Sequence, residues 1–216
     1  VTFLKGQDPR RIGFLTHYLM QQTRFPPGAL GLAAISALDH CMWDISAKAL
    51  GVPVYMLLGG NVRDRVKVYA GVSTAPDPAA ARDELDALQS DWGITAFKLS
   101  PYRMDIHRHR WGEVVRSSAE YFRQLRETVR SDYEIAFDAH AKIFEVGQAM
   151  QLANALAPYD PLFFEEPLRP ENVEAWGELK RGVHCTLATG ESLYSRFEFQ
   201  RLLNARLLVA QAMDGQ

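Results

Sequence analysis

Cysteine is scarce in this sequence, and long apolar runs are absent from it. Only two of the 216 residues are cysteine, and both lie in apolar stretches, so we interpret Cys41 and Cys185 as packed thiols. The longest apolar runs are too short to span a bilayer, and no stretch resembles a signal peptide. These features predict a cytoplasmic protein with no membrane partner.

The sequence also lacks an excess of charge of either sign. Its 24 Lys and Arg residues oppose 26 Asp and Glu residues, giving a net charge of −2. This balance gives no electrostatic reason to expect nucleic acid or an anionic membrane surface as a partner. With 47% hydrophobic and 23% charged residues and no low-complexity tract, the composition is that of a soluble globular protein. The length is sufficient for one ordinary domain or for parts of two.

Two regions of the chain have different sequence patterns. In residues 1–62 a polar start leads to the sequence FPPG and then to a long helix, expected at about 30–50. Its apolar residues recur at helical spacing, and Gly51 and Pro53 provide a stop signal. The apolar residues expected on one face of this helix are Ile35, Leu38, Met42, Ile45 and Ala49.

From residue 66 onward, strand-like runs alternate with helical segments. The strands are expected at 66–70, 95–99, 134–138, 162–165, 184–188 and 205–210. Repeated βα units favour a parallel sheet, and their number favours a barrel over a doubly wound sheet. A closed barrel of this type needs eight strands. We therefore predict an α/β fold with a partial (β/α)8 TIM barrel of about six strands, and a chain that looks truncated.

Three acidic residues, Asp138, Glu165 and Glu191, lie near the ends of three successive predicted strands, in the runs IAFD, PLFFE and CTLATGE. The steps between them are 27 and 26 residues, about one βα unit each. In a parallel barrel this repeat places all three carboxylates at the same mouth. Three carboxylates without a cysteine ligand suit a hard cation, most simply Mg²⁺. The alternative is that they are ordinary solvated or helix-capping carboxylates.

Neighbouring residues extend the prediction. Two residues past Asp138, His140 is expected to point the same way along the strand. A metal and a titratable side chain together indicate an enzyme. Glu166 follows Glu165 and should face the opposite side of its strand, where we expect a supporting or structural role.

Several segments together resemble a known family. The stretch ALDHCMWDISAKALGVPVYMLLGG (37–60) resembles the closing helix of the capping domain in the enolase superfamily, in its mandelate racemase/muconate lactonising enzyme branch. The motifs AFKLS, FDAH, FFEEP and TGES follow in the order and spacing of that branch's barrel strands two to five. The Asp-x-His motif at Asp138 is closest to that of the galactonate dehydratase-like acid-sugar dehydratases.

The resemblance implies a domain division and a chemistry. Residues 1–62 would be the C-terminal part of an α+β capping domain, and 63–216 would be the first six strands of the barrel. The implied activity is that of a lyase: Mg²⁺-dependent dehydration of an aldonate to a 2-keto-3-deoxy acid, through α-proton abstraction and an enediolate. Asp138, Glu165 and Glu191 would be the metal ligands and His140 the general acid. The full-length protein is expected to form a homo-oligomer.

Lys98 and the loop after it are interpreted within this resemblance. Other family members carry Lys-x-Lys on the second strand, whereas this sequence has Lys98-Leu99-Ser100, which counts against two-base racemisation. Lys98 is expected to bind the substrate carboxylate or the enediolate oxygen. The alternative is a lysine extending from the barrel rim into solvent. The loop 101–112 could contact a polyhydroxy acid or could simply be solvated.

Other functions remain open at this point. The same superfamily site also serves racemases, epimerases and cycloisomerases. A chain lacking the last barrel strands could also be a non-catalytic truncated fragment. In sugar-acid dehydratases the base is commonly a histidine on the seventh strand, so no residue of this sequence is assigned as the base.

Overall fold

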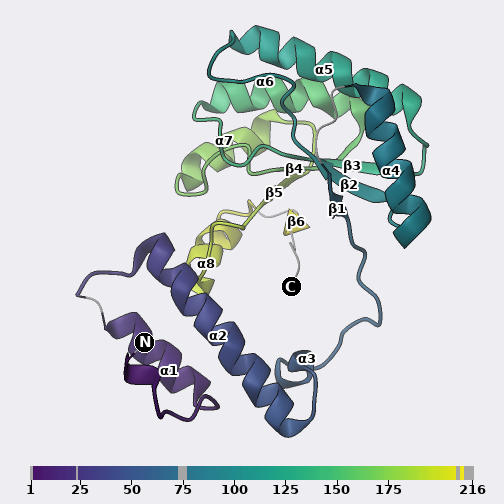
Figure 1. Ribbon diagram of the computed structural model, residues 1–216. Helices are drawn as coiled ribbons and strands as arrows, with labels where there is room; N and C mark the ends of the chain where they lie inside the picture. The colour runs from purple at the N-terminus through teal and green to yellow at the C-terminus, as the bar shows by residue number, and fades with distance from the viewer. Residues whose placement is uncertain (1, 23, 73–76, 208–209, 212–216) are drawn as a thin grey trace. The chain divides into compact units, whose positions relative to one another are not determined.

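The computed structural model describes residues 2–22, 24–72, 77–207 and 210–211 of the chain. The chain divides into two compact units. One comprises Val1–Val66 with Leu193–Ser195, and the other comprises Lys67–Ser192 with Arg196–Gln216 (Figure 1).

The first unit is helical. Its elements are η1 (Thr2–Leu4), α1 (Ile12–Gln21), α2 (Gly28–Leu50) and α3 (Val54–Leu57). The long predicted helix is therefore confirmed as α2, and it ends where the stop signal predicted. Gly51 has a φ of 70°, and its N–H donates to the carbonyls of Ala47 and Lys48. Although α2 has 23 residues, neither it nor any other helix in the described part of the chain is long and apolar enough to cross a membrane.

Fewer residues of α2 are buried than its sequence suggested. Of the apolar face, Met42 is buried, but the side chain of Ile45 is 44% exposed. Cys41 is also exposed, so its interpretation as a packed thiol was wrong, and Cys185 in the second unit is only half-buried. An α-helix buries one stripe of its surface, and Cys41 lies about 100° around the helix from Met42, so an apolar neighbourhood in sequence does not ensure burial.

The second unit is a parallel sheet whose strands alternate with helices. Its elements are β1 (Ala70–Gly71), α4 (Pro78–Trp92), β2 (Ala96–Leu99), α5 (Trp111–Thr128), β3 (Glu134–Asp138), α6 (Val146–Leu156), η2 (Ala157–Tyr159), β4 (Pro161–Glu165), α7 (Val173–Gly182), β5 (Leu187–Thr189), α8 (Arg196–Asn204) and β6 (Ala210–Gln211). The spatial order is β1-β2-β3-β4-β5-β6, and every neighbouring pair is parallel. Sequential parallel neighbours are the arrangement of a barrel wall, so the predicted partial-barrel fold is confirmed.

Three strands begin more than one residue away from their predicted starts. Residues 66–69 lie outside β1, which among the described residues pairs only with β2. Residues 184–186 precede β5, which instead continues to Thr189. The predicted sixth strand began at 205, but 205–207 are not a strand, 208–209 lie outside the described residues, and β6 begins at Ala210. Apolar composition located the strands, but hydrogen bonding to a neighbour sets their ends.

The two faces of the sheet have different packing. Helices α4 to α7 lie along one face (Figure 1), where Phe122 and Phe137 pack edge to face with ring centroids 4.3 Å apart. On the other face, Ala136, Phe163 and Ala188 form a small buried cluster. Because side chains alternate along a strand, the residue two positions after Ala136 or Phe163 shares that second face. Those residues are Asp138 and Glu165.

Candidate active site

The three predicted ligand carboxylates converge at the carboxyl ends of the strands. Asp138 ends β3 and lies in register opposite Glu165, which ends β4. Glu191 follows the end of β5 by two residues. One carboxylate oxygen from each of the three lies within 4.8 Å of the others. The even spacing in the sequence therefore predicted their convergence correctly.

These carboxylates are arranged to receive a cation. Asp138 is buried, Glu165 is 0% exposed and Glu191 is exposed. Burial raises the pKa of Glu165, and the charges of Asp138 and Glu191 raise it further, while Lys98 lowers it. Glu165 Oε1 is buried without a hydrogen-bond partner among the described residues. An all-oxygen donor set with an unpaired buried oxygen and surplus negative charge fits a hard divalent cation.

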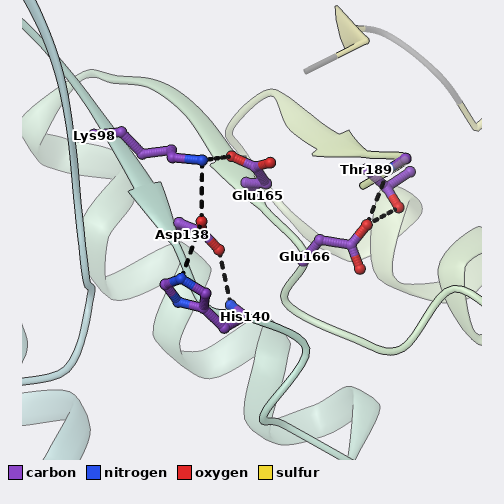
Figure 2. Close-up of polar contacts among 7 residues, drawn as sticks. Lys98, Asp138, His140, Glu165, Glu166 and Thr189 are labelled. Carbon is purple, nitrogen blue, oxygen red and sulfur yellow. Dashed lines mark hydrogen bonds and ion pairs between the residues drawn. The ribbon is translucent and has the colours of Figure 1, made fainter. Parts of the chain in front are cut away.

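Lys98 lies between two of these carboxylates. Its Nζ is 3.0 Å from Glu165 Oε2 and 3.1 Å from Asp138 Oδ2 (Figure 2). Burial lowers the pKa of the ammonium, but the hydrogen bonds and charges of Glu165 and Asp138 outweigh this effect, so the net shift is upward. The side chain is only 15% exposed. It therefore does not extend from the rim into solvent, and it brings one positive charge to a group of three carboxylates.

His140 also lies beside these carboxylates, but it belongs to a turn after β3 and not to the strand itself. Strand β3 ends at Asp138, and His140 has a φ of 52°, in the left-handed region. The reasoning from strand alternation was therefore wrong, although the side chain still lies beside the carboxylates. The backbone N–H of His140 donates to Asp138 Oδ1 at 2.8 Å, and its Nε2 is 3.5 Å from Asp138 Oδ2 (Figure 2). The side chain is 56% exposed, so its imidazole remains open to solvent.

The loop after β2 has a fixed base and an exposed tip. The Tyr102 hydroxyl donates to the carbonyl of Ala139, the residue between Asp138 and His140, at 3.2 Å. Burial and the charge of Asp138 raise the pKa of Tyr102. The Arg103 guanidinium lies over the ring of Tyr121 on α5, 3.7 Å from its centroid. The tip of this loop is exposed, including His107 and His109.

Glu166 points away from the three carboxylates. Its side chain is fully buried and is directed toward the end of β5, where Thr189 lies (Figure 2). Burial raises its pKa, while bonds from the Thr189 hydroxyl and the Gly190 amide lower it. The prediction that Glu166 faces the opposite side from Glu165 is confirmed.

Two features near the site had only a weak sequence signal. Tyr102 was one of several polar residues in a charged loop, and its partner is 37 positions away. The contacts of Glu166 are 23 and 24 positions away, on the next βα unit. The glycine of the TGES motif was the available hint that the backbone turns sharply here. Gly190 has a φ of 137°, a conformation that residues with a side chain rarely adopt.

Comparison with known families gives two matches along the chain. Residues 80–214 match the model for the enolase C-terminal domain-like family. Residues 1–59 match the mandelate racemase/muconate lactonizing enzyme N-terminal domain. Together these matches include every residue of the candidate site.

Curated relatives and solved structures agree with these matches. The chain is 37% identical over 207 residues to a D-galactonate dehydratase from Ralstonia nicotianae, covering 94% of the chain and 52% of the relative. A D-galactonate dehydratase from Verminephrobacter eiseniae is 38% identical over 209 residues, with 94% and 52% covered. The chain thus spans about half the length of the curated relatives it matches.

Among solved structures, an enolase from Agrobacterium radiobacter, provisionally named a galactarate dehydratase, was crystallised with Na and L-malate bound. It is 69% identical to this chain, with a TM-score of 0.89, and 97% of this chain and 54% of that one are covered. An enolase from Pantoea ananatis with bound D-gluconate and Mg is 25% identical, with a TM-score of 0.82 and 98% and 58% covered.

Proposed function

Because the chain belongs to the mandelate racemase/muconate lactonizing enzyme family of enolase-like proteins, we propose that the protein is a hydro-lyase that dehydrates a sugar acid to a 2-keto-3-deoxy acid. The observation that carries this proposal is the convergence of Asp138, Glu165 and Glu191 beside His140 and Lys98. Relatives named for dehydration of D-galactonate support the reaction type.

The three carboxylates would hold a divalent cation, which we propose is Mg²⁺. The unpaired Glu165 oxygen and the all-oxygen donor set support this assignment, as does the Mg bound in the D-gluconate complex of the Pantoea ananatis enolase. When bound, the cation would offset the second negative charge that develops on the substrate carboxylate as the α-proton leaves, a stabilisation on the order of several kcal/mol.

Two side chains of this chain would act on the substrate. His140 would donate a proton to the departing β-hydroxyl, which then leaves as water, because imidazole exchanges protons near neutral pH. Its exposed imidazole is accessible to a substrate bound at the strand ends. The Lys98 ammonium would attract the substrate carboxylate and stabilise the charge that develops on its oxygen. We assign no described residue as the base that removes the α-proton.

The substrate is proposed to be an aldonic or aldaric acid. Such acids carry a carboxylate for Lys98 and the cation, an acidic α-hydrogen, and a hydroxyl at the β-carbon as the leaving group. Relatives named for D-galactonate, or solved with D-gluconate, support this class. The candidate members are therefore D-galactonate, galactarate and D-gluconate.

The test is product chemistry in the presence of Mg²⁺. The full-length protein is incubated with each acid, and 2-keto acid formation is followed by the absorbance of the semicarbazone. The full-length wild type should form a keto acid from at least one of them. His140→Asn should reduce the rate by roughly 10²- to 10⁴-fold, as expected for loss of a general acid.

Deuterium exchange identifies the competing activity of the family. If the only products in D₂O were the labelled substrate and its epimer, without keto acid, the protein would be an epimerase and the dehydratase proposal would be wrong. A His140→Asn chain that dehydrates at the wild-type rate would remove His140 from the general-acid role. Glu178→Gln, an exposed change on α7, is the control expected to leave the rate unchanged.

A further inference from the structure

Glu166 is a buried acidic residue that the proposed reaction does not use. We propose that it is a positioning residue: its carboxylate fixes the peptide that presents Glu191, while its backbone carbonyl holds the turn that carries His140. The inference rests on the proposed function, since it concerns how one of the three metal-binding carboxylates is placed. Glu166 itself touches neither the substrate nor the cation in this account.

The backbone of Glu166 connects the ends of three strands. Its N–H donates to the carbonyl of Ala188 on β5 at 3.0 Å, and its carbonyl accepts from the N–H of Ala141 at 2.8 Å. Ala141 follows His140, and both have a positive φ, as does Glu166 itself at 39°. A non-glycine residue adopts such a conformation only where its surroundings enforce it. Glu166 is therefore held in one fixed position between β3 and β5.

The side chain of Glu166 holds the next strand end. Glu166 Oε1 accepts hydrogen bonds from the Thr189 hydroxyl and from the backbone N–H of Gly190, the latter at 2.9 Å. Thr189 ends β5, and Gly190 joins it to Glu191. Beyond the end of the ladder at Thr189, the carboxylate of Glu166 replaces the neighbouring strand as the partner of this peptide.

Gly190 shows why this peptide needs a partner. Its φ of 137° is a conformation that other residues rarely adopt, and an added Cβ would lie 3.1 Å from the ring of Phe199. Glycine leaves the backbone free to adopt many other conformations. The bond from its N–H to Glu166 selects one of them, and this conformation determines the direction in which Glu191 leaves the strand.

Stability alone does not explain a carboxylate at this position. Glu166 is 0% exposed, and its Oε2 has no hydrogen-bond partner in the part of the chain that the structure describes. Burying a charged group is unfavourable, and an apolar residue of similar size often serves a core as well or better. A role in directing the Gly190 peptide accounts for the acceptor, because an apolar side chain offers none.

The test separates placement from folding with two readouts. The Mg²⁺ dissociation constant is measured by calorimetry on the chain, and exchange of the Gly190 amide hydrogen is measured by NMR on the metal-free chain. Glu166→Ala should weaken Mg²⁺ binding about 10- to 100-fold, as loss of a supporting residue commonly does. It should also speed Gly190 exchange on the order of ten-fold or more.

Conservative variants provide the rescue. Glu166→Gln retains an acceptor oxygen and should keep Mg²⁺ affinity within about three-fold of the wild type. Thr189→Val removes one of the two donors and should weaken binding roughly five-fold. If Glu166→Ala fails to fold, as judged by circular dichroism, these two variants decide the matter. Glu178→Ala, an exposed change on α7, is the matched control and should leave both readouts unchanged.

The outcomes distinguish this inference from the proposed function. If the wild-type chain binds Mg²⁺ and Glu166→Ala or Thr189→Val binds it equally well, the positioning role is wrong and the metal site stands. If the wild-type chain does not bind Mg²⁺, but Gly190 exchange still depends on Glu166, the metal site is wrong and the positioning contact stands. Gly190 exchange unchanged in both folded variants would overturn the inference in either case.

Discussion

The two ends of the same parallel sheet hold their charged side chains in different ways. At the carboxyl ends of β2 to β5, charged side chains face one another, with Lys98 placed between Asp138 and Glu165. At the amino ends, Arg126 faces backbone carbonyls. It donates to the carbonyls of Tyr159, Tyr133 and Asp160 at 2.9, 2.6 and 3.0 Å.

The two ends differ in the partners of their charged groups. The carbonyls around the half-buried Arg126 accept three hydrogen bonds from its guanidinium, and these bonds link the segments that precede β3 and β4. Burial lowers the pKa of Arg126, and its carbonyl partners carry no net charge that could pair with a ligand. At the other end, three carboxylates face one ammonium, and one buried Glu165 oxygen has no partner among the described residues. Between these two ends, surplus negative charge is found among the described residues of the carboxyl end and not around Arg126.

Concavity alone would point to the other end of the sheet. A cavity of about 560 Å³ lies at the amino ends, where its lining includes Arg126, Glu134 and Thr186. Ligands often bind in cavities of this size. None of the candidate ligands lines this one. In α/β barrels the carboxyl ends of the strands carry the chemistry, and the charge distribution here agrees with that rule.

The largest expected effect is on the carboxyl end. Glu165→Gln removes one of the proposed ligands and should weaken Mg²⁺ binding by about 100-fold or more, because the cation loses a charged ligand. Stability without metal should not fall, since the pKa of Glu165 is raised and the variant removes a buried charge that is unfavourably placed. Calorimetric titration and urea unfolding of the same sample give both values. If the variant bound Mg²⁺ as tightly as the wild type, Glu165 would not be a ligand, and the proposed difference in cation binding between the two ends would be wrong.

At the amino end we expect the opposite result, a loss of stability without a loss of Mg²⁺ affinity. Arg126→Met removes three hydrogen bonds to backbone carbonyls and should lower the free energy of unfolding by about 2 kcal/mol, while Mg²⁺ affinity stays the same. Urea unfolding measures the change. The matched control is Arg123→Met, whose exposed ion pairs with Glu120 and Glu127 should contribute less than about 1 kcal/mol. If the Arg126 variant were as stable as the control, the hydrogen bonds from Arg126 to the carbonyls would not contribute to the stability of the amino end.

The last expected effect is a pH dependence at the amino end. Burial raises the pKa of the Cys185 thiol from its ordinary value of 9.0 to about 11. The folded chain therefore holds this proton more tightly than the unfolded chain does. The resulting stability is fully present below pH 9 and is lost as the pH rises through about 11. Stability curves of the wild type and Cys185→Ala should converge over this interval, and parallel curves would contradict the shift.

The sequence predicted the candidate site better than it predicted the details around it. Even spacing was sufficient to bring Asp138, Glu165 and Glu191 together, because each βα unit of a parallel barrel returns the chain to the same mouth. The position of His140 depends on a left-handed turn that follows β3, which strand alternation does not describe. The contacts of Glu166 join side chain and backbone across two βα units, and a single sequence carries little information about such pairs.

Burial in the first unit was the least predictable feature. Helical spacing placed α2 correctly, yet Cys41 and Ile45 are exposed. Periodicity identifies the apolar stripe of a helix, but only the packed neighbours determine how much of that stripe is covered. The described neighbours cover a narrow part of it, centred on Met42, Ser46 and Ala47.

Thermal unfolding of the chain with and without Mg²⁺ tests the central claim most directly. If the carboxyl ends of β3, β4 and β5 form a cation site, Mg²⁺ at about 100 times its dissociation constant adds about 2.7 kcal/mol. That should raise the midpoint of a cooperative transition by roughly 5–10 °C, compared with KCl at equal ionic strength, and Glu165→Gln should remove the increase. An identical midpoint with and without Mg²⁺ in the wild-type chain would contradict the account.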